Sequence, residues 1–179
     1  TYQGGLITFY AQWRVCVTYE SAGGTNAPVD LTYYKENATV NVKLDNDLGN
    51  LQRDGYNFDG WNTEWDGTGD AYNSSTPSFT ITKNTTLCAQ WKGTVTYDLN
   101  GGYGTPPSDP KEYREGDDVF VQFGSFTRNG YIFAGWNTER NGSGLAYTES
   151  TQNTPFPFRG HVTLYAQWIG TGTPQPNKY

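Results

Sequence analysis

The fold is decided by a decapeptide that occurs twice, as GYNFDGWNTE at residues 55–64 and as GYIFAGWNTE at residues 130–139. A second pattern occurs three times, as TFYAQW at 8–13, TLCAQW at 86–91 and TLYAQW at 163–168. The closing tryptophans of this pattern are 78 and then 77 residues apart. Such a regular spacing indicates tandem modules rather than one large domain.

These repeats divide the chain into four parts. We expect residues 1–13 to be the final strand of a preceding module, 14–91 and 92–168 to be complete modules, and 169–179 to be a Gly/Pro/Thr linker. The junctions between modules are very short, so we expect an elongated and fairly stiff string. The chain contains no Met, and we take it as an excised piece of a longer protein.

Composition and periodicity favour short strands joined by tight turns. Aromatic residues make up 16% of the chain and there are 22 glycines, while Thr, Val, Tyr and Asn are common. Apolar residues alternate with polar ones, as in Val15, Val17 and Tyr19, which is typical of half-buried strands. We therefore predict a mainly β fold, α+β at most.

The charge balance excludes some partners. A net charge of −6 disfavours nucleic acid and anionic lipid, both of which attract a basic surface. No apolar run is long enough to span a bilayer, so direct membrane insertion is not expected.

The recurring aromatic residues have two readings, as sugar-stacking platforms or as the core of small modules. They alternate in phase with Leu and Ala, and a small module must bury large side chains to be stable, so we favour the core. The predicted core set is Tyr56, Phe58, Trp61, Trp91, Tyr131, Phe133, Trp136 and Trp168.

Two other aromatic residues are candidates for a ligand or protein contact. Trp65 lies in a turn of Asp and Gly, and its counterpart in the second module is Arg140. Tyr165 lies on the outward face of the last strand, where Cys88 takes its place in the first module. A lone exposed aromatic residue remains the alternative, because scattered ones are normal on protein surfaces.

No pattern in the chain indicates catalysis or a cofactor. His161 is the single histidine and is read as an exposed strand residue, which leaves no multi-histidine metal site. Glu64 and its repeat Glu139 give one acid per module, not the facing pair that a glycosidase needs. The turn at Asp66–Asp70 has oxygen ligands at alternate positions, but its repeat has lost both carboxylates, so a plain turn is favoured. We predict no enzyme, no metal and no cofactor.

The strings Gly-Tyr-x-Phe-x-Gly-Trp-Asn-Thr and Thr-Leu-Tyr-Ala-Gln-Trp resemble the internalin B-repeat family, also called the Listeria–Bacteroides repeat. The leading Val95-Thr-Tyr-Asp-Leu-Asn-Gly-Gly102 fits the family as well. The resemblance covers about nine tenths of the chain and implies β-grasp-like modules on bacterial cell-surface or secreted proteins, linked to adhesion. It implies no catalytic residues. One departure is Cys88 in place of the expected Tyr, and another is a segment, 36–53, four residues longer than its counterpart at 115–128.

The β-grasp arrangement implied by this resemblance makes the first and last strands of a module parallel neighbours. Cys16 and Cys88 would then lie on the outward faces of adjacent strands, within reach of a disulfide. We predict a Cys16–Cys88 disulfide formed outside the reducing cytoplasm, with two unpaired packing residues as the alternative.

Two functions remain in competition. The first is an extracellular spacer with an adhesive role, which contacts a host or bacterial surface protein or glycan. The second is a carbohydrate-binding module that uses exposed aromatics, which should keep its aromatics in each copy. The apolar strand Leu6–Trp13 also suggests self-association through residues 1–13, because unpaired strands invite pairing with another sheet edge.

Overall fold

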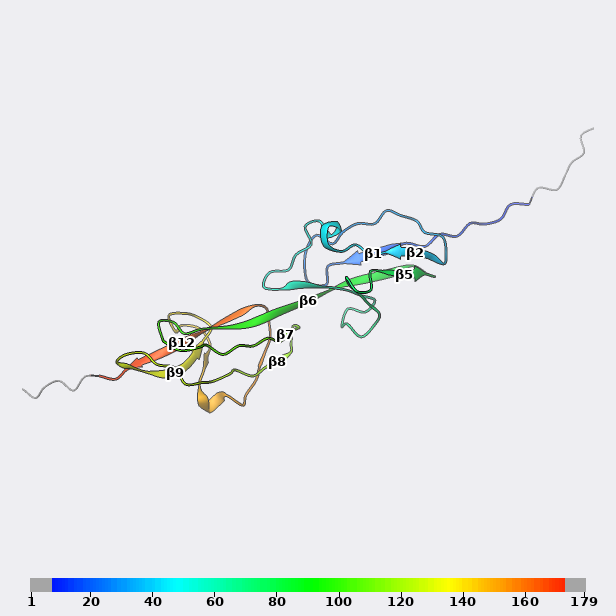
Figure 1. The fold of residues 1–179 in the computed structure, drawn as a ribbon. Coiled ribbons are helices and arrows are strands. Elements are labelled where there is room, and N and C mark those ends of the chain that lie inside the picture. Colours follow the sequence, from blue (N-terminus) through cyan, green and yellow to red (C-terminus); the bar gives the residue numbers. More distant parts are fainter. Residues whose placement is uncertain (1–7, 173–179) are drawn as a thin grey trace, which may run out of the picture. The chain divides into compact units, whose positions relative to one another are not determined.

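The computed structural model describes residues 8–172 of the 179-residue chain (Figure 1). The start of the predicted strand Leu6–Trp13 and most of the predicted linker at 169–179 therefore lie outside the described residues. Internal contacts divide the chain into unit 1, Thr1–Arg53 with Phe58–Gln90, and unit 2, Asp54–Asn57 with Trp91–Tyr179. Each unit is described in turn.

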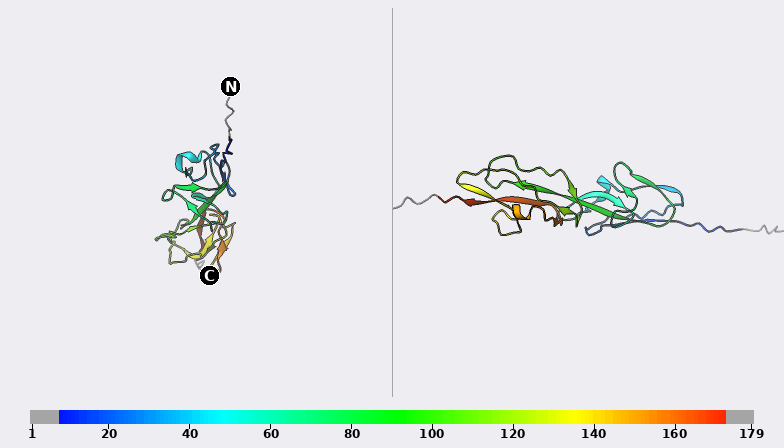
Figure 2. Two further views of the ribbon diagram at one scale, coloured as in Figure 1. Left: turned by 90° about the vertical axis from the view of Figure 1, so that its right-hand side faces the viewer. Right: turned by 90° about the horizontal axis from the view of Figure 1, so that it is seen from below.

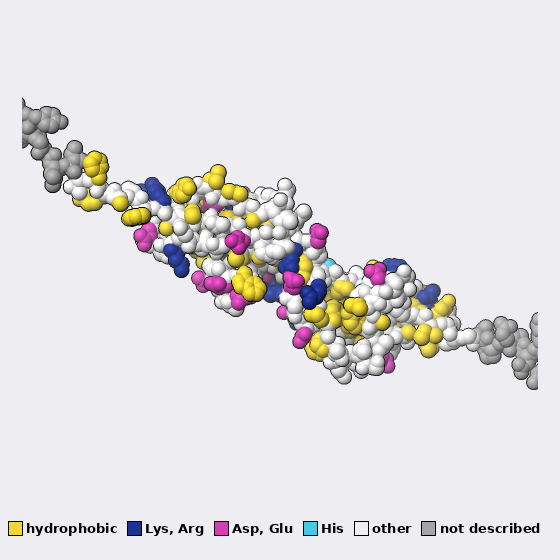
Figure 3. Space-filling view, turned by 180° about the vertical axis from the view of Figure 1, so that it is seen from behind, with side chains coloured by type: hydrophobic (Ala, Val, Ile, Leu, Met, Phe, Trp, Pro, Cys, Tyr) yellow, Lys and Arg dark blue, Asp and Glu magenta, His cyan; other side chains and the backbone are white. Residues whose placement is uncertain are grey.

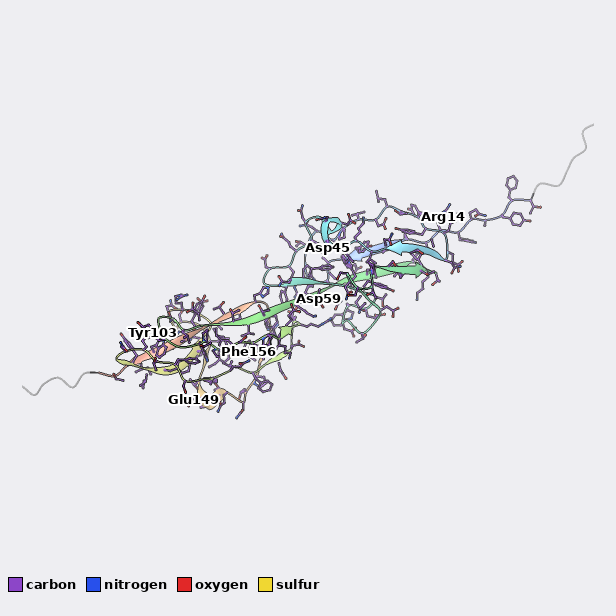
Figure 4. The ribbon with its side chains drawn as sticks, viewed as in Figure 1. Arg14, Asp45, Asp59, Tyr103, Glu149 and Phe156 are labelled. Carbon is purple, nitrogen blue, oxygen red and sulfur yellow. The ribbon has the colours of Figure 1, made fainter. Side chains whose placement is uncertain are left out.

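Unit 1 is built from short strands and one 3₁₀ turn. Its elements are β1 (Val17–Glu20), β2 (Ala38–Asn41), the turn η1 (Asp45–Leu48), β3 (Asn57–Asn62), β4 (Ala71–Tyr72), β5 (Ser78–Ile81) and the first part of β6 (Thr85–Asp98). The main sheet has β1, β3 and β4 with β6, while β2 and β5 form a separate antiparallel pair. The extra residues predicted as a loop at 36–53 include η1, which begins at Asp45 (Figure 4).

Unit 2 repeats these strands with one addition. Its elements are the second part of β6, β7 (Glu112–Tyr113), β8 (Asp118–Val119), β9 (Tyr131–Asn137), β10 (Ala146–Tyr147), η2 (Glu149–Thr151), β11 (Phe156–Pro157) and β12 (Val162–Gly170). The additional strand is β7, and the 3₁₀ turn lies between β10 and β11. The main sheet follows the order β10, β9, β12, β6, and β8 pairs with β11. Figure 2 gives two further views of the ribbon. The predicted mainly β class is confirmed, since the only helical elements within residues 8–172 are the two short 3₁₀ turns.

The first and last strands of each module are parallel neighbours. β1 pairs with β6 from Val17 opposite Thr85 to Glu20 opposite Cys88. In unit 2, β12 pairs with β6 from Val162 opposite Val95 onward. This is the strand arrangement that the family resemblance implied, while the β-grasp assignment as a whole stays a prediction.

A tyrosine and a tryptophan form the centre of each core. In unit 1 the rings of Tyr19 and Trp61 meet edge to face at 4.7 Å. The Tyr19 hydroxyl accepts a hydrogen bond from the backbone N–H of Lys43, and Trp61 Nε1 donates to the carbonyl of the same residue. Both aromatic residues thus bury their rings and satisfy their polar atoms on one loop residue.

Unit 2 repeats this clamp. Tyr97 and Trp136 meet at 4.9 Å, the Tyr97 hydroxyl accepts from the N–H of Gln122, and Trp136 Nε1 donates to the Gln122 carbonyl. The loop that carries Lys43 and the loop that carries Gln122 differ in length, yet in each loop one residue hydrogen-bonds to both aromatic side chains. The clamp therefore fixes the loop to the sheet in both repeats.

The glycine before each central tryptophan is required by the backbone. Gly60 has a φ of +105°, and a side chain there would begin 2.7 Å from the carbonyl oxygen of Tyr72. Gly135 has a φ of +122° and faces the carbonyl of Tyr147 in the same way. The pairing of β12 with β9 shifts register beside Gly135, so this glycine forms a β-bulge that bends the strand.

The residues predicted as core are buried or half-buried, with one exception. Trp61, Trp91 and Trp136 are buried, and Tyr56, Phe58, Phe133 and Trp168 are half-buried. Trp168 donates from Nε1 to the carbonyl of Leu99. The prediction is wrong for Tyr131, which is 43% exposed because it lies at the first position of β9, beyond the rings of Phe133 and Trp168.

The described part of the predicted strand Leu6–Trp13 is not a strand. Residues 8–13 carry no strand assignment, and Phe9, Tyr10 and Trp13 are exposed. The strand prediction is wrong for this segment in the chain as described. A strand needs a neighbour for its backbone groups, and alternation alone does not supply one.

Candidate interaction surface

The turn after each central tryptophan is organised by a buried asparagine. Asn62 is 2% exposed, and its Oδ1 accepts from the N–H groups of Glu64 and Gly69. Its Nδ2 donates to the carbonyls of Gly67 and Gly69. One side chain therefore closes the whole turn from residue 62 to residue 69.

Asn137 makes the same four bonds in unit 2. Its Oδ1 accepts from Glu139 and Gly144, and its Nδ2 donates to Gly142 and Gly144. Neither asparagine was predicted to have a structural role. The signal was present, because the pattern Asn-Thr-Glu followed by Gly-x-Gly occurs in both repeats.

Trp65 is presented at the tip of this turn in unit 1. Its side chain is 78% exposed. From behind, Gln90 Nε2 donates to the carbonyls of Glu64 and Trp65, at 3.4 Å in each case. The turn is thus fixed to β6 while the indole faces solvent, which is a suitable geometry for a binding contact.

In unit 2 the same turn presents Arg140 instead. Gln167 repeats the support with bonds to the carbonyls of Glu139 and Arg140. The Arg140 guanidinium lies 4.7 Å from the ring centroid of Tyr165 and donates to Asp98 Oδ2 at 2.6 Å. Tyr165 is therefore half-buried beneath a cation and not presented as a free aromatic face.

The predicted Cys16–Cys88 disulfide is not formed, and both cysteines are free thiols. The register places Cys88 opposite Glu20, whereas Cys16 lies beside Asn84, whose Oδ1 accepts from the Cys16 N–H at 3.1 Å. Four residues along a strand separate the thiols by about 13 Å. That separation exceeds the reach of a disulfide, which needs Cα atoms within about 7 Å.

Cys88 is also buried, although it lies on the same face of the sheet as the exposed Glu20. It is 7% exposed, and burial, followed by the nearby carboxylates of Glu20 and Glu64, raises the pKa of its thiol. A raised pKa keeps the sulfur protonated and unreactive at neutral pH. Cys88 therefore acts as a small packing residue, the alternative left open by the sequence.

A row of apolar side chains lies on the loop before β2. Val29, Leu31 and Tyr33 are 73%, 85% and 72% exposed. The equivalent positions in unit 2 are Ser108, Pro110 and Glu112. The two loops can be aligned because each contains a hydrogen bond from a tyrosine hydroxyl to an aspartate. That bond joins Tyr34 to Asp30 and Tyr113 to Asp109.

The carboxylate of Asp66 is hydrogen-bonded within its own turn. Asp66 Oδ1 accepts from Thr68 Oγ1 at 2.7 Å and from its N–H at 3.1 Å, and these bonds lower the pKa of the carboxyl. Asn141 binds Ser143 in the same way. Across residues 8–172 no group of three or more His, Cys, Asp or Glu side chains could hold a metal ion.

His161 has a structural partner. It lies directly before β12, and its Nδ1 accepts from the N–H of Thr94 at 3.0 Å. Asn84 does the same for Cys16 in unit 1. His161 is thus an exposed residue directly before β12 that closes the start of a strand pair, one position outside the strand in which it was predicted.

Exposed apolar and charged side chains are intermixed on the face seen in Figure 3. Within the described residues, no helix is long and apolar enough to cross a membrane. Two exposed features that differ between the repeats are therefore local. One is the turn tip, with Trp65 or Arg140, and the other is the loop row, with Val29, Leu31 and Tyr33 or Ser108, Pro110 and Glu112.

Comparison with known proteins finds one repeat family twice in the chain. The sequence profile of the Listeria-Bacteroides repeat domain matches residues 16–90 and residues 94–167. A protein of Evansella cellulosilytica named "Putative Gly-rich membrane protein" is 40% identical over 135 residues, which are 71% of this chain and 15% of that protein. A second from the same organism, named "Putative membrane protein", is 32% identical over 173 residues, or 89% of this chain and 23% of that protein. The chain thus spans less than a quarter of either relative, and with two matched repeats it belongs to the Listeria–Bacteroides repeat family.

Proposed function

We propose that this chain is a non-catalytic repeat region of a bacterial surface or secreted protein, acting as a stiff spacer and as an adhesion module. One observation supports the proposal: the two units have the same internal framework but expose different side chains. Clamp, central glycine and asparagine turn recur in both units, while the turn tip and the loop row differ. Side chains that vary on a constant framework are the usual arrangement for binding.

The adhesive contact belongs to unit 1. Trp65 gives a rigid indole on a fixed turn, and Val29, Leu31 and Tyr33 give an apolar row on another loop of the same unit. Exposed Trp and Tyr are typical of contact centres with another protein. A protein on a host or bacterial surface is therefore the partner that the chemistry favours.

The test compares matched variants in a pull-down from solubilised surface proteins. We expect Trp65→Ala to reduce capture at least tenfold, as for a contact centre, and Arg140→Ala in the equivalent turn to leave capture unchanged. Equal capture by wild type and Trp65→Ala would overturn the assignment of the contact to unit 1. Thermal unfolding of each variant checks that the framework is intact.

A carbohydrate-binding module is the second candidate, supported by one groove. A shallow hollow of about 350 Å³ in unit 1 is lined by Tyr72 and Phe79 together with Glu64, Asp70 and several threonines. Its volume lies within the range of small-molecule sites. A glycan array distinguishes the candidates, because binding lost in Asp70→Asn but kept in Trp65→Ala favours the groove.

The spacer role rests on the junction. β6 continues from Thr85 to Asp98 through the short sequence Trp91-Lys92-Gly93, so no flexible linker separates the two repeats in sequence. We propose that this limits bending in solution. Small-angle scattering with a maximum dimension no larger than that of a sphere of 179 residues would contradict the spacer role.

Self-association through residues 1–13 stays a proposal. Phe9, Tyr10 and Trp13 expose apolar surface that another sheet edge could cover. Deletion of residues 1–13 should then abolish any dimer seen by analytical ultracentrifugation. An unchanged oligomeric state after deletion would exclude this route.

A further inference from the structure

Residues 54–57 belong to the first repeat in sequence but to unit 2 in space. The ring of Tyr56 meets that of Phe158 edge to face at 5.8 Å, and it packs against the buried core of unit 2. The carbonyl of Gly55 accepts a hydrogen bond from the N–H of His161 at 2.6 Å. Gly55 and Tyr56 thus form a docking element that is inserted into unit 2.

The second repeat carries the same element in a different state. Gly130 and Tyr131 are the equivalents of Gly55 and Tyr56, and Tyr131 is 43% exposed. Ile132 and Ile169, which lie opposite each other at the end of the sheet, are 55% and 57% exposed. The Tyr131 ring is covered only in part, by the Arg128 guanidinium 4.4 Å from its centroid.

The backbone hydrogen bonds show the same difference. In the second repeat the N–H of Thr171 donates to the carbonyl of Gly130. The equivalent groups in the first repeat are the N–H of Thr94 and the carbonyl of Gly55, and both bind His161, through Nδ1 and N–H respectively. In the first repeat, His161 therefore binds the two backbone groups whose equivalents, in Thr171 and Gly130, bind each other in the second repeat.

We propose that Gly130, Tyr131, Ile132 and Ile169 form a docking face for a further repeat of this same family. The occupant presents its equivalents of Phe158, Gly160 and His161, and Tyr131 extends its core as Tyr56 extends that of unit 2. On docking, the bond from Thr171 to Gly130 opens, and both groups bind the incoming residue at the His161 position.

The occupant needs glycine at the position of Gly160. This residue has a φ of +119°, and a side chain there would begin 3.2 Å from the Gly55 carbonyl and 3.4 Å from the Tyr56 ring. The first repeat has Lys83 at this position, so it fits the face less well than the second repeat does. A second copy of the repeat at 92–168 is therefore the occupant of choice.

The test uses the full chain and an extended chain in which a copy of residues 95–172 follows Thr171. In the extended chain, Tyr131→Ala should lower the unfolding temperature by several degrees, as Tyr56→Ala does in both chains. In the original chain, Tyr131→Ala should change the unfolding temperature by less than a degree. If Tyr131→Ala changed the unfolding temperature by less than a degree in both chains, the proposal would be overturned.

A second measurement needs no mutation of the docking face. Oxidative footprinting should show Tyr131 protected several-fold in the extended chain compared with the original, with Tyr103 as the exposed control, at 65% exposure. In the appended copy, His161→Asn should keep this protection, because Asn84 performs the same task in the first repeat, whereas His161→Ala should weaken it. Equal oxidation of Tyr131 in both chains would refute docking.

Discussion

The two repeats share their interior and differ at their surfaces. Tyr19 with Trp61 and Tyr97 with Trp136 clamp equivalent loop residues with nearly the same geometry. On the exposed side, Trp65 of the first repeat faces solvent, whereas Arg140 of the second lies over Tyr165 and binds Asp98. The comparison teaches that the framework tolerates surface change because its turns and loops are fixed from inside.

The largest expected effect is the loss of unfolding free energy when a clamp tryptophan is removed. Comparing this loss between the units tests whether the two clamps are equivalent. Trp61→Ala and Trp136→Ala each remove a fully buried indole and should cost about 3–5 kcal/mol of unfolding free energy. Urea denaturation followed by near-ultraviolet circular dichroism measures the cost. A difference of more than about 2 kcal/mol between the variants would show that the repeats do not use the clamp equally.

The next largest loss of unfolding free energy is expected from removing the asparagine of each turn. Asn62→Ala and Asn137→Ala each leave two N–H groups and two carbonyl groups without their partner, at a cost of about 1–3 kcal/mol. Hydrogen exchange at the amides of Gly69 and Gly144 should speed up in the respective variant. Unchanged exchange would mean that the turn holds its shape without the side chain.

Alkaline pH tests the buried tyrosines of both clamps. Burial raises the pKa of Tyr19 to about 12 and raises that of Tyr97 as well. A folded-state pKa above the unfolded value of about 10 gives stability that is fully present below pH 10 and lost as pH rises toward 12. Absorbance at 295 nm should show a group of tyrosines that ionise only above about pH 11, together with unfolding.

Tyr19→Phe provides the control for this titration. It removes the acceptor of the Lys43 N–H and should cost about 1 kcal/mol at neutral pH. The decline in stability between pH 10 and 12 should be smaller in this variant. The same decline in Tyr19→Phe and wild type would assign the alkaline effect to other groups.

The smallest effect is expected at the surface of the second repeat. Arg140→Ala removes a partly exposed ion pair with Asp98, worth at most about 1 kcal/mol, and uncovers Tyr165. Thermal unfolding should therefore change little, while iodination of Tyr165 should speed up. A large loss of stability would show that the cation and the ring belong to the framework.

The fold class and most of the core followed from the sequence. The spacing of the repeats located the modules, and alternation assigned Val17, Tyr19, Leu87 and Ala89 to the inner face, where the structure places them. Alternation has this power because successive side chains on a strand point to opposite faces. The exposure of Tyr131 was not predicted, because its environment depends on what lies beyond the end of β9.

The alternation of side chains is enough to assign strand residues to a face of the sheet, whereas the register between strands depends on contacts in the folded chain. Cys16 and Glu20 share one face of β1, and Glu20 lies opposite Cys88, so the predicted disulfide failed by four residues along the strand. A shift of two or four residues keeps every side chain on its face, so alternation cannot distinguish such registers. Contacts across long separations, such as His161 with Gly55 and Thr94, decide between them.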